Sequence, residues 1–333
     1  MSEIVSAAAP AASTAPSFTV VIPTYNGAER LPRVLAQLRS QTGVETLAWE
    51  ILVVDNNSRD QTAALVQQIQ KDWGDSTPRL NYVFEAQQGA AFARQRGIQS
   101  VQSEWIGFLD DDIIPADSWV AAAYAFYQAH PEVGAFGGQI HGDFEVPPPD
   151  NFKRIQSFLA IRERGSTAHL YRPEHLVLPP SAAWVINRRA WLSTVPLTPQ
   201  LRGRTQGSMV QGDDYEPLIF MHKAGYSIWY NPAMHVHHQI PKRRLEPDYL
   251  IALSRGCGLC VCSLQMLRVE PWQAPLTMAR LTLGNFKRLA RHWFEYGDIS
   301  RADVVTQCER AFFVSSLVSP LYFLSARLRH NRA

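Results

Sequence analysis

The sequence predicts an α/β protein in which a mixed, mainly parallel β-sheet carries helices on both faces. Two observations support this prediction. Short apolar, β-branched runs alternate with longer amphipathic segments, and polar clusters directly follow several of the apolar runs. Strands that alternate with helices are typical of parallel sheets covered on both sides. In such sheets ligands bind beyond the carboxyl ends of the strands, which is where the polar clusters fall.

The expected elements follow one another along the chain with short connections. Strands are expected at residues 18–23, 49–54, 80–85, 105–109, 133–140, 184–187 and 227–230. Helices are expected at residues 28–40, 61–71, 89–102, 118–130 and 214–223. Residues 147–178 begin with three prolines and lack a clear period, and long irregular segments of this kind tend to be binding loops. We therefore expect this segment to contact a substrate.

Three consecutive carboxylates, Asp110, Asp111 and Asp112, follow the strand at 105–109. Neighbouring carboxylates repel one another, and the usual reason to keep them at a strand end is a divalent cation, Mg²⁺ or Mn²⁺. Because alternate residues of an extended segment point the same way, Asp110 and Asp112 can face one ligand while Asp111 faces elsewhere. The alternative is a solvated acidic turn that caps a helix near Ala116.

Polar clusters follow three of the strands, at residues 24–26, 55–58 and 110–112, so we expect them to converge on one crevice. A second acidic cluster contains Asp213 and Asp214 at a predicted helix start, where helix capping is the alternative explanation. No G-x-G-x-x-G follows the first strand, and no G-x-x-x-x-G-K-[ST] motif is present. Both absences argue against dinucleotide-binding and phosphate-loop proteins.

The two ends of the chain differ from the main domain, which we place at residues 18–241. Residues 1–17 are rich in Ala, Ser and Pro and lack the basic start and apolar stretch of a secretory signal, so they are expected to form a flexible tail. Residues 242–333 carry 14 Lys and Arg against 7 Asp and Glu, whereas residues 1–241 carry 18 against 23. This asymmetry predicts a basic helical extension with a separate role.

No run of 18 uninterrupted apolar residues is present, so no transmembrane helix is expected. Residues 311–326 are mostly apolar, are interrupted by Pro320 and precede several arginines. Two interpretations stay open. This segment lies in a membrane interface with its basic residues on anionic lipid, or it packs on the main domain or a dimer partner.

Three of the four cysteines lie close together, at Cys257, Cys260 and Cys262. A zinc site would need a second ligand cluster at suitable spacing, and none is found. We therefore favour small buried residues in a reducing compartment, which fits the cytoplasm.

Six short motifs occur in an order that resembles the family 2 nucleotide-sugar glycosyltransferases with the GT-A fold. They are VIPTYN (21–26), VVDNNS (53–58) with Asp60 and Thr62, Gly89 with Ala93-Arg94 and Gly97, FLDDD (108–112) with Pro115, GDD (212–214) and the late Pro232 to His238. The resemblance covers roughly residues 18–258. The segment from His238 to Gly258 is similar, more narrowly, to cyanobacterial enzymes assigned to hormogonium polysaccharide synthesis.

The resemblance implies a binding site for a nucleoside-diphosphate sugar. Asp55 would accept a hydrogen bond from the nucleotide base, with Pro23, Tyr25 and Asn26 lining the same pocket and Arg94 beside the base or ribose.

The diphosphate end of this site would be built from the aspartate triplet. Asp110 would hold the ribose, Asp111 would belong to the same donor site, and Asp112 would bind Mg²⁺ or Mn²⁺ on the diphosphate. His238, with the arginines at 243–244 nearby, would contact the metal or the departing diphosphate.

The resemblance also implies a catalytic base, Asp214, with Asp213 beside it as the other candidate. The sequence departs from the family pattern at three positions. Asn56 stands where a second Asp is usual, Gln95 where Asn is usual, and Asp213 where Glu is usual. These changes keep the residues that the chemistry needs, but Asn56 weakens any inference about which nucleotide base the donor carries.

Several of these residues have a structural alternative. Asp55 could cap the following helix, and Arg94 could pair with a surface acid. Trp184 could stack on an acceptor sugar or lie in the core. His235 and His237 are expected to be structural, on the side of their strand opposite Val236.

The implied function is inverting, metal-dependent transfer from a nucleoside-diphosphate sugar, with UDP favoured, to a polysaccharide or lipid-linked glycan. The alternatives are a sugar-phosphate nucleotidyltransferase and a non-catalytic nucleotide-sugar-binding protein. A processive synthase is disfavoured because Q-x-x-R-W is absent. The expected location is the cytoplasm, at the inner face of the plasma membrane if the C-terminal helices bind lipid. No nucleic-acid partner is expected, and the oligomeric state stays open.

Overall fold

The computed structural model describes residues 16–74, 76–204, 208–297 and 302–330. The expected tail at residues 1–17 lies almost wholly outside the described residues. The strands are β1 (Phe18–Thr24), β2 (Trp49–Asp55), β3 (Arg79–Phe84), β4 (Trp105–Leu109), β5 (Ile113–Pro115), β6 (Ala135–Phe144), β7 (His169–Leu170), β8 (Ala183–Asn187) and β9 (Ile228–Ile240). The helices are α1 (Leu31–Arg39), α2 (Thr62–Trp73), α3 (Ala90–Ser100), α4 (Trp119–Ala129), α5 (Arg188–Thr194), α6 (Tyr215–Lys223), α7 (Pro247–Leu259), α8 (Val261–Arg268), α9 (Ala274–Tyr296) and α10 (Val304–His330).

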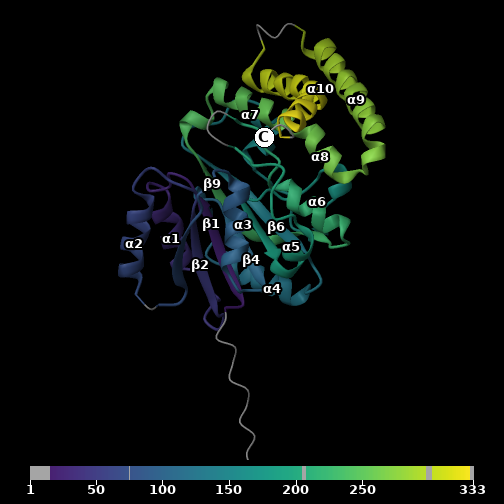
Figure 1. Ribbon diagram of the computed structural model, residues 1–333. Coiled ribbons are helices and arrows are strands. Elements are labelled where there is room, and N and C mark those ends of the chain that lie inside the picture. The colour runs from purple at the N-terminus through teal and green to yellow at the C-terminus, as the bar shows by residue number, and fades with distance from the viewer. Residues whose placement is uncertain (1–15, 75, 205–207, 298–301, 331–333) are drawn as a thin grey trace, which may run out of the picture.

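One mixed sheet forms the centre of the protein, with helices on both sides and the C-terminal helices gathered at one end (Figure 1). Its strand order is β3-β2-β1-β4-β8-β6-β9-β5, and β7 pairs with β9. β1 is parallel to β2 and β4, and β2 is parallel to β3. β8 runs antiparallel to β4 and β6, whereas β9 is parallel to β6. The predicted α/β fold is confirmed.

The alternation of side chains along β1 explains why both faces of the sheet are covered. Phe18, Val20 and Ile22 belong to one core with α1, α2 and α4, while Val21 belongs to the other with α3, α5, α6 and α8. Successive residues of a strand point to opposite faces, so a continuous apolar run must be buried on both sides. Each of these four side chains is fully buried and contributes about 1.5–3 kcal/mol of hydrophobic stabilisation.

The last long strand extends beyond its predicted end at residue 230. β9 continues to Ile240 across Pro232, because β9 bulges where its register with β6 shifts. In this bulge the Asn231 side chain accepts a hydrogen bond from the Ala233 N–H over 3.1 Å. Proline lacks a ladder donor and is tolerated at such a bulge. The longer strand carries the three histidines at 235–238 back toward β5.

A third apolar core joins the C-terminal extension to the main domain. It contains Phe152 and Leu159 from the irregular segment, Leu250 and Leu253 from α7, and Val305 from α10. α7 and α10 pack tightly at Gly258, where an added Cβ would lie 2.6 Å from the Phe312 carbonyl oxygen. The inner face of α10 therefore packs on the protein, as one of the two interpretations of this segment expected.

α10 continues through Pro320, where the sequence suggested a break. Proline removes the N–H that would bond to the Ser316 carbonyl one turn earlier. That carbonyl instead accepts hydrogen bonds from Asn285 Nδ2 at 3.2 Å and from Ser319 Oγ at 2.7 Å. Two side-chain donors therefore satisfy the carbonyl that the proline leaves unpaired.

Two described segments have the length and composition of a membrane span, contrary to the expectation that none would. They are Pro247–Arg268 and Val304–Leu328. The expectation failed because it required an uninterrupted apolar run, whereas mean hydropathy tolerates scattered polar residues. Half of the apolar window in the first segment is buried within the protein, as in a core helix, against 22% in the second.

Candidate active site

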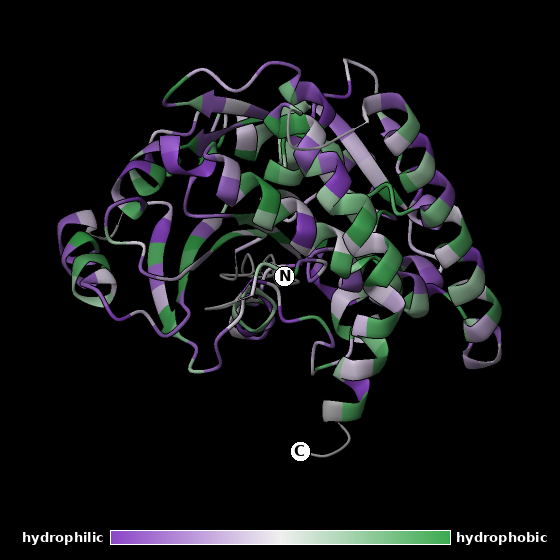
Figure 2. Ribbon diagram, turned by 90° about the horizontal axis from the view of Figure 1, so that it is seen from above, coloured by the Kyte–Doolittle hydropathy of each residue, from purple (hydrophilic) through white to green (hydrophobic). Residues whose placement is uncertain are grey.

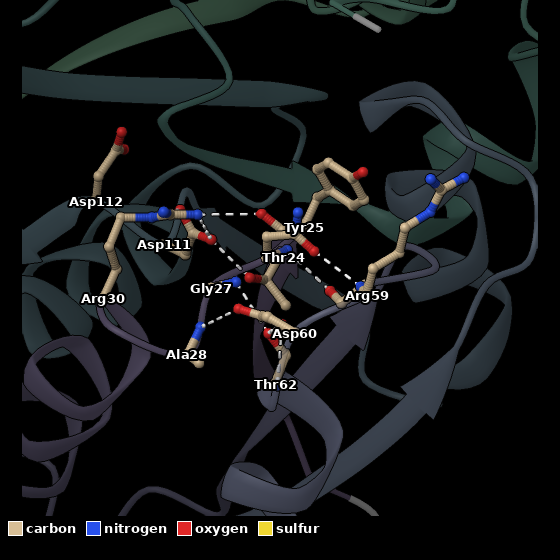
Figure 3. Close-up of polar contacts among 12 residues, drawn as sticks. Thr24, Tyr25, Gly27, Ala28, Arg30, Arg59, Asp60, Thr62, Asp111 and Asp112 are labelled. Atoms are coloured by element: carbon tan, nitrogen blue, oxygen red, sulfur yellow. Dashed lines mark hydrogen bonds and ion pairs between the residues drawn. The ribbon is translucent and has the colours of Figure 1, made fainter. Parts of the chain in front are cut away.

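The loops that follow β1 and β2 are tied together by side chains from both. The Asn26 N–H donates to Ser58 Oγ at 2.9 Å, and Asn26 Oδ1 accepts from the Arg59 N–H at 2.8 Å. The Gly27 N–H donates to Thr62 Oγ1 at 2.9 Å (Figure 3). Asn26 has a φ of +49°, a conformation that asparagine adopts more readily than most residues. Its side chain therefore shapes the predicted donor pocket by fixing the loop.

Asp55 lies at the end of β2 with both carboxylate oxygens hydrogen-bonded. Oδ1 accepts from the Ser58 N–H at 2.9 Å, and Oδ2 accepts from the Tyr82 hydroxyl at 2.8 Å. Burial and the Asp55 charge raise the pKa of Tyr82 to about 12, so this hydroxyl stays a donor. α2 begins only at Thr62 and has no side-chain cap, so helix capping does not explain Asp55.

Pro23 near the end of β1 and Tyr25 in the following loop are half-buried. Asn56, the departure from the family pattern, is buried. Its Oδ1 accepts from the Gly89 N–H at 2.8 Å and its Nδ2 donates to the Gln87 carbonyl. An asparagine can both donate and accept here, which an aspartate could not. Asn56 therefore connects the loop after β2 to the start of α3.

The three adjacent aspartates separate into two environments, as the alternation argument expected. Asp111 accepts two hydrogen bonds from Arg30, at 2.9 and 2.8 Å, and one from Thr24 Oγ1 at 2.6 Å (Figure 3). These contacts anchor the turn to the loop after β1. In Figure 3 Asp112 points away from the Arg30 contacts. Asp111 therefore has a positioning role within the site.

Asp112 is buried and contacts the side chains of Arg244 and His238. Its Oδ2 is 2.7 Å from Arg244 Nη2 and 3.6 Å from His238 Nε2. Pairing of β5 with β9, which sets Ile113 opposite His238, brings these residues together. The expected alternative, an acidic turn capping a helix, is wrong because β5 follows the triplet. Burial alone would raise the pKa of Asp112, but His238 and Arg244 hold it well below its usual range.

Asp112 and His238 offer an oxygen and a nitrogen ligand that fit a divalent cation. His238 Nδ1 lies 2.8 Å from the Leu159 carbonyl oxygen, and Nε2, the nitrogen nearer Asp112, accepts a hydrogen bond from Arg244 Nη1 at 2.8 Å. A metal on Nε2 would therefore have to displace this arginine. Among the described residues, no group of three or more His, Cys, Asp or Glu side chains could hold a metal, the cysteines at 257–262 included. Further ligands would have to come from a bound diphosphate.

Arg94 forms a buried ion pair with Asp213, not with a surface acid. Its Nη1 donates to Asp213 Oδ2 at 2.7 Å. Asp214 is the next residue, partly accessible at the start of α6, and its side chain does not cap the helix. Burial and the Asp213 charge raise the pKa of Asp214 to about 6, against the opposing effect of Arg94. A carboxylate with a pKa near neutrality suits a general base.

Arg204 is a charged residue of this site that the sequence interpretation missed. Burial lowers its pKa, but Tyr249, Asp110 and Asp112 raise it above its ordinary value. The Arg204 side chain also donates to the Tyr249 hydroxyl at 3.3 Å. Burial raises the pKa of Asp110, opposed by Arg94 and Arg204. Residues 195–204 lack a periodic pattern, and the only signal for this residue was the short Arg-Gly-Arg run at 202–204.

Trp184 lies in the core, and His235 and His237 lie on the less buried face of β9. Trp184 is fully buried and packs against Phe108 and Trp191, so the acceptor-stacking hypothesis is wrong. His235 and His237 lie on the face of β9 opposite the buried Val236, as expected.

Comparison with known proteins identifies the family to which these motifs belong. The sequence profile of glycosyl transferase family 2 matches residues 19–190, just over half of the chain. The glycosyltransferase AglE of Haloferax volcanii is 36% identical over 173 residues, which cover 50% of this chain and 55% of that protein. A β-1,3-glucosyltransferase of Campylobacter jejuni, named for GalNAc(5)-diNAcBac-PP-undecaprenol, is 31% identical over 99 residues, or 29% of this chain and 30% of that protein. This chain therefore matches between about a third and about half of the length of these relatives.

Two solved structures share the fold over almost the whole chain. The mannosyltransferase PcManGT from Pyrobaculum calidifontis, in complex with GDP-Man and Mn²⁺, aligns with a TM-score of 0.56 at 20% identity. That alignment covers 92% of this chain and 88% of the other. TarS residues 1–349 from S. aureus, in complex with UDP, align with a TM-score of 0.50 at 14% identity, covering 93% and 92%. With the GT-A fold confirmed and the family profile matching just over half of the sequence, the chain belongs to glycosyl transferase family 2.

Proposed function

We propose that this enzyme transfers a sugar with inversion from a nucleoside-diphosphate sugar, UDP favoured, to a polysaccharide or lipid-linked glycan. The observation that carries this proposal is the position of Asp214. This carboxyl has a raised pKa, is partly accessible and adjoins the Arg94–Asp213 pair, whose arginine also acts on Asp110. A base and a diphosphate-binding cluster therefore meet at one edge of the sheet.

The donor would lie along the carboxyl ends of the strands. Asp55, Pro23 and Tyr25 would bind the base and Asp110 the ribose. Arg204 and Arg244, which both act on Asp112, carry charge of the right sign to stabilise a departing diphosphate. We propose that Asp112 and His238 hold Mg²⁺ or Mn²⁺, which would stabilise the negative charge that develops on the diphosphate.

Transfer is one in-line displacement. The acceptor oxygen forms a bond to the anomeric carbon as the bond from that carbon to the diphosphate oxygen breaks, and the acceptor proton passes to Asp214. Such a base contributes about 10²–10⁴-fold to the rate. The raised pKa of Asp214 keeps it a stronger base than an ordinary aspartate, while at neutral pH it is still mostly ionised.

Two of the similar proteins support the finer parts of this proposal. PcManGT was solved with GDP-Man and Mn²⁺, which supports a metal-bound donor. The Campylobacter jejuni relative is named for an undecaprenol-diphosphate glycan, which supports a lipid-linked acceptor.

The test is release of nucleoside diphosphate from a panel of UDP-, GDP- and dTDP-sugars, with Mn²⁺ or Mg²⁺ and a glycan or lipid extract as acceptor. We expect release from one donor, and loss of release with chelator and in Asp112→Asn and Asp214→Asn. Donor binding without release, unchanged in Asp214→Asn, would support the binding-protein alternative. Consumption of a nucleoside triphosphate with a sugar phosphate would support the nucleotidyltransferase.

We further propose that the extension holds the enzyme at the cytoplasmic face of a membrane. α9 exposes several large apolar side chains, and basic residues alternate with them along its sequence. Figure 2 shows hydrophobic and hydrophilic residues mixed along the helices near the C-terminus. The apolar residues are Leu276, Leu283, Phe286, Trp293 and Phe294, and the basic residues are Arg280, Lys287, Arg288 and Arg291. Aromatic and basic residues on one helix favour an anionic lipid surface.

Vesicle flotation tests this placement. We expect flotation with vesicles that contain phosphatidylglycerol, and little with phosphatidylcholine alone. Phe294→Glu should reduce it, because Phe294 is 88% exposed and has little to lose inside the protein. Equal flotation of Phe294→Glu and the unaltered enzyme would contradict a role for α9.

A further inference from the structure

A cavity of about 390 Å³ opens beside the proposed base. It lies between residues 153–164, residues 176–178 and Tyr215, the residue that follows Asp214. The first two walls belong to the irregular segment that the sequence suggested as a substrate contact. No residue proposed to bind the donor lines this cavity, so it forms a separate space next to the site of proton transfer.

The cavity is strongly basic. Lys153, Arg162 and Arg164 line it, together with one acid, Glu163. Glu163 is engaged elsewhere, since its Oε1 lies 2.8 Å from His141 Nδ1. Within the described part of the chain, no carboxylate forms an ion pair with any of the three cations. Three cations against one carboxylate give this hollow a net positive charge, which favours an anionic ligand.

Two of these cations are held in place by the fold. The backbone N–H and carbonyl of Arg162 both bond to Ile140 on β6, at 2.9 and 2.8 Å. Its Nη1 donates to the Ile161 carbonyl at 3.0 Å. The guanidinium of Arg164 lies over the ring of Tyr171, 5.1 Å from the ring centre. A guanidinium that is already oriented loses less freedom when it binds an anion.

The cavity and the proposed base are neighbours. Arg162 is hydrogen-bonded to the side chain of Tyr215, whose backbone adjoins Asp214. Burial raises the pKa of Cys257 to about 12, and the charges of Asp214 and Arg162 both act on this thiol. A ligand in the cavity would therefore lie next to the hydroxyl that Asp214 deprotonates.

We propose that this cavity binds an anionic group of the acceptor, adjacent to the reacting sugar. The group is either the carboxylate of a uronic acid or the phosphate that links a sugar to a lipid. Both carry charged oxygens that two guanidinium groups and an ammonium can bind. This proposal rests on the glycosyl transfer proposed above and narrows its acceptor to acidic ones.

The test measures binding of defined probes by isothermal titration to the full-length enzyme with the donor nucleotide and Mn²⁺ at saturation, so that the donor site is filled. The probes are methyl glucuronide, decyl glucosyl phosphate and the neutral methyl glucoside. We expect one acidic probe to bind at least about tenfold more tightly than the neutral one, the strength of a charge-assisted hydrogen bond. Which acidic probe binds distinguishes a uronic acid from a lipid phosphate.

Arg164→Gln and Lys153→Gln should each raise the Kd of the acidic probe about tenfold. The Kd of the nucleotide should stay unchanged, which would show that each variant is folded. Arg172→Gln is the matched control, because Arg172 is an exposed arginine of the same segment that does not line the cavity. Equal binding of acidic and neutral probes, or an equal loss in Arg172→Gln, would overturn the proposal. Failure of the donor panel would instead show as absent nucleotide binding and release.

Discussion

Arg94 Nη1 lies 2.7 Å from Asp213 Oδ2, and the two side chains are only 5% and 9% exposed. This pair joins α3 to the start of α6 across 119 residues of sequence. A buried arginine needs a charged partner, and Asp213 supplies one. Asp213 therefore acts on Asp214 in two ways, since it positions the neighbouring backbone and repels the charge of the base.

Replacement of the proposed base should abolish transfer without preventing donor binding. In Asp214→Asn the amide cannot take a proton, so kcat should fall by about 10²–10⁴-fold. The Kd of the donor nucleotide should change little, because Asp214 lies on the acceptor side. Steady-state kinetics and titration of the nucleotide measure the two effects. An Asp214→Asn enzyme with more than about a tenth of normal kcat would point to Asp213 as the base.

The pH dependence of kcat/KM should report the carboxyl of Asp214. Only the ionised form accepts a proton, so activity should rise with pH through the pKa of about 6. Asp213→Asn removes a neighbouring negative charge and leaves Arg94 unpaired, and both changes favour the ionised base. The acidic limb should therefore move to lower pH. A limb that stays at the same pH, or moves upward, would show that another group controls it.

Replacement of Asp111 and replacement of Asp112 should have different effects. Asp112→Asn should weaken activation by Mn²⁺ by about 100-fold or more, because it removes a proposed ligand. Asp111→Asn should instead lower the free energy of unfolding by about 1–3 kcal/mol, since it disrupts the bonds from Arg30 and Thr24. Metal titration of activity and urea denaturation separate the two. A shared phenotype would argue against the division of the triplet.

Two glycines of the extension form a matched pair for stability. Gly258→Ala should destabilise the protein by about 1–3 kcal/mol, because the new Cβ would meet the Phe312 carbonyl oxygen on α10. Gly284→Ala should stabilise it by about 0.5–1 kcal/mol, because that helical position is open and glycine disfavours helices. Chemical denaturation measures both. Equal effects would mean that α7 and α10 are not closely packed in solution.

Much of the fold could be predicted because its signals are local. The buried strands end within a residue of their predicted positions where a polar turn follows at once, as at Leu109 and Asp55. Prediction failed where distant contacts override a local signal. The strand at 227–230 was expected to stop short of Pro232, and Pro320 was expected to interrupt residues 311–326. A bulge opposite β6 and donors from α9 and α10 instead satisfy the backbone at these positions.

Prediction of the site likewise succeeded for local signals and failed for distant contacts. The motifs identified the acids, since carboxylates at strand ends are visible in the sequence. Arg244 was expected at the diphosphate end of the site, but Arg30 and Arg204 could not be predicted as partners of the aspartates, because they reach them from separate segments. Arg94 was expected to bind a nucleotide or a surface acid, and only the fold reveals its buried partner.

The hydrogen bond from Asn285 of α9 to the Ser316 carbonyl of α10 would connect a membrane surface to the rest of the enzyme. Contacts run without interruption from exposed α9 to α10, from α10 to α7 at Gly258, and from Tyr249 of α7 to Arg204 in the active site. The extension thus contributes a side chain to the candidate active site, and its removal would take away the Tyr249 hydroxyl, which accepts a hydrogen bond from Arg204. If α9 binds a membrane as proposed above, that binding would act on the same chain of contacts that holds Arg204.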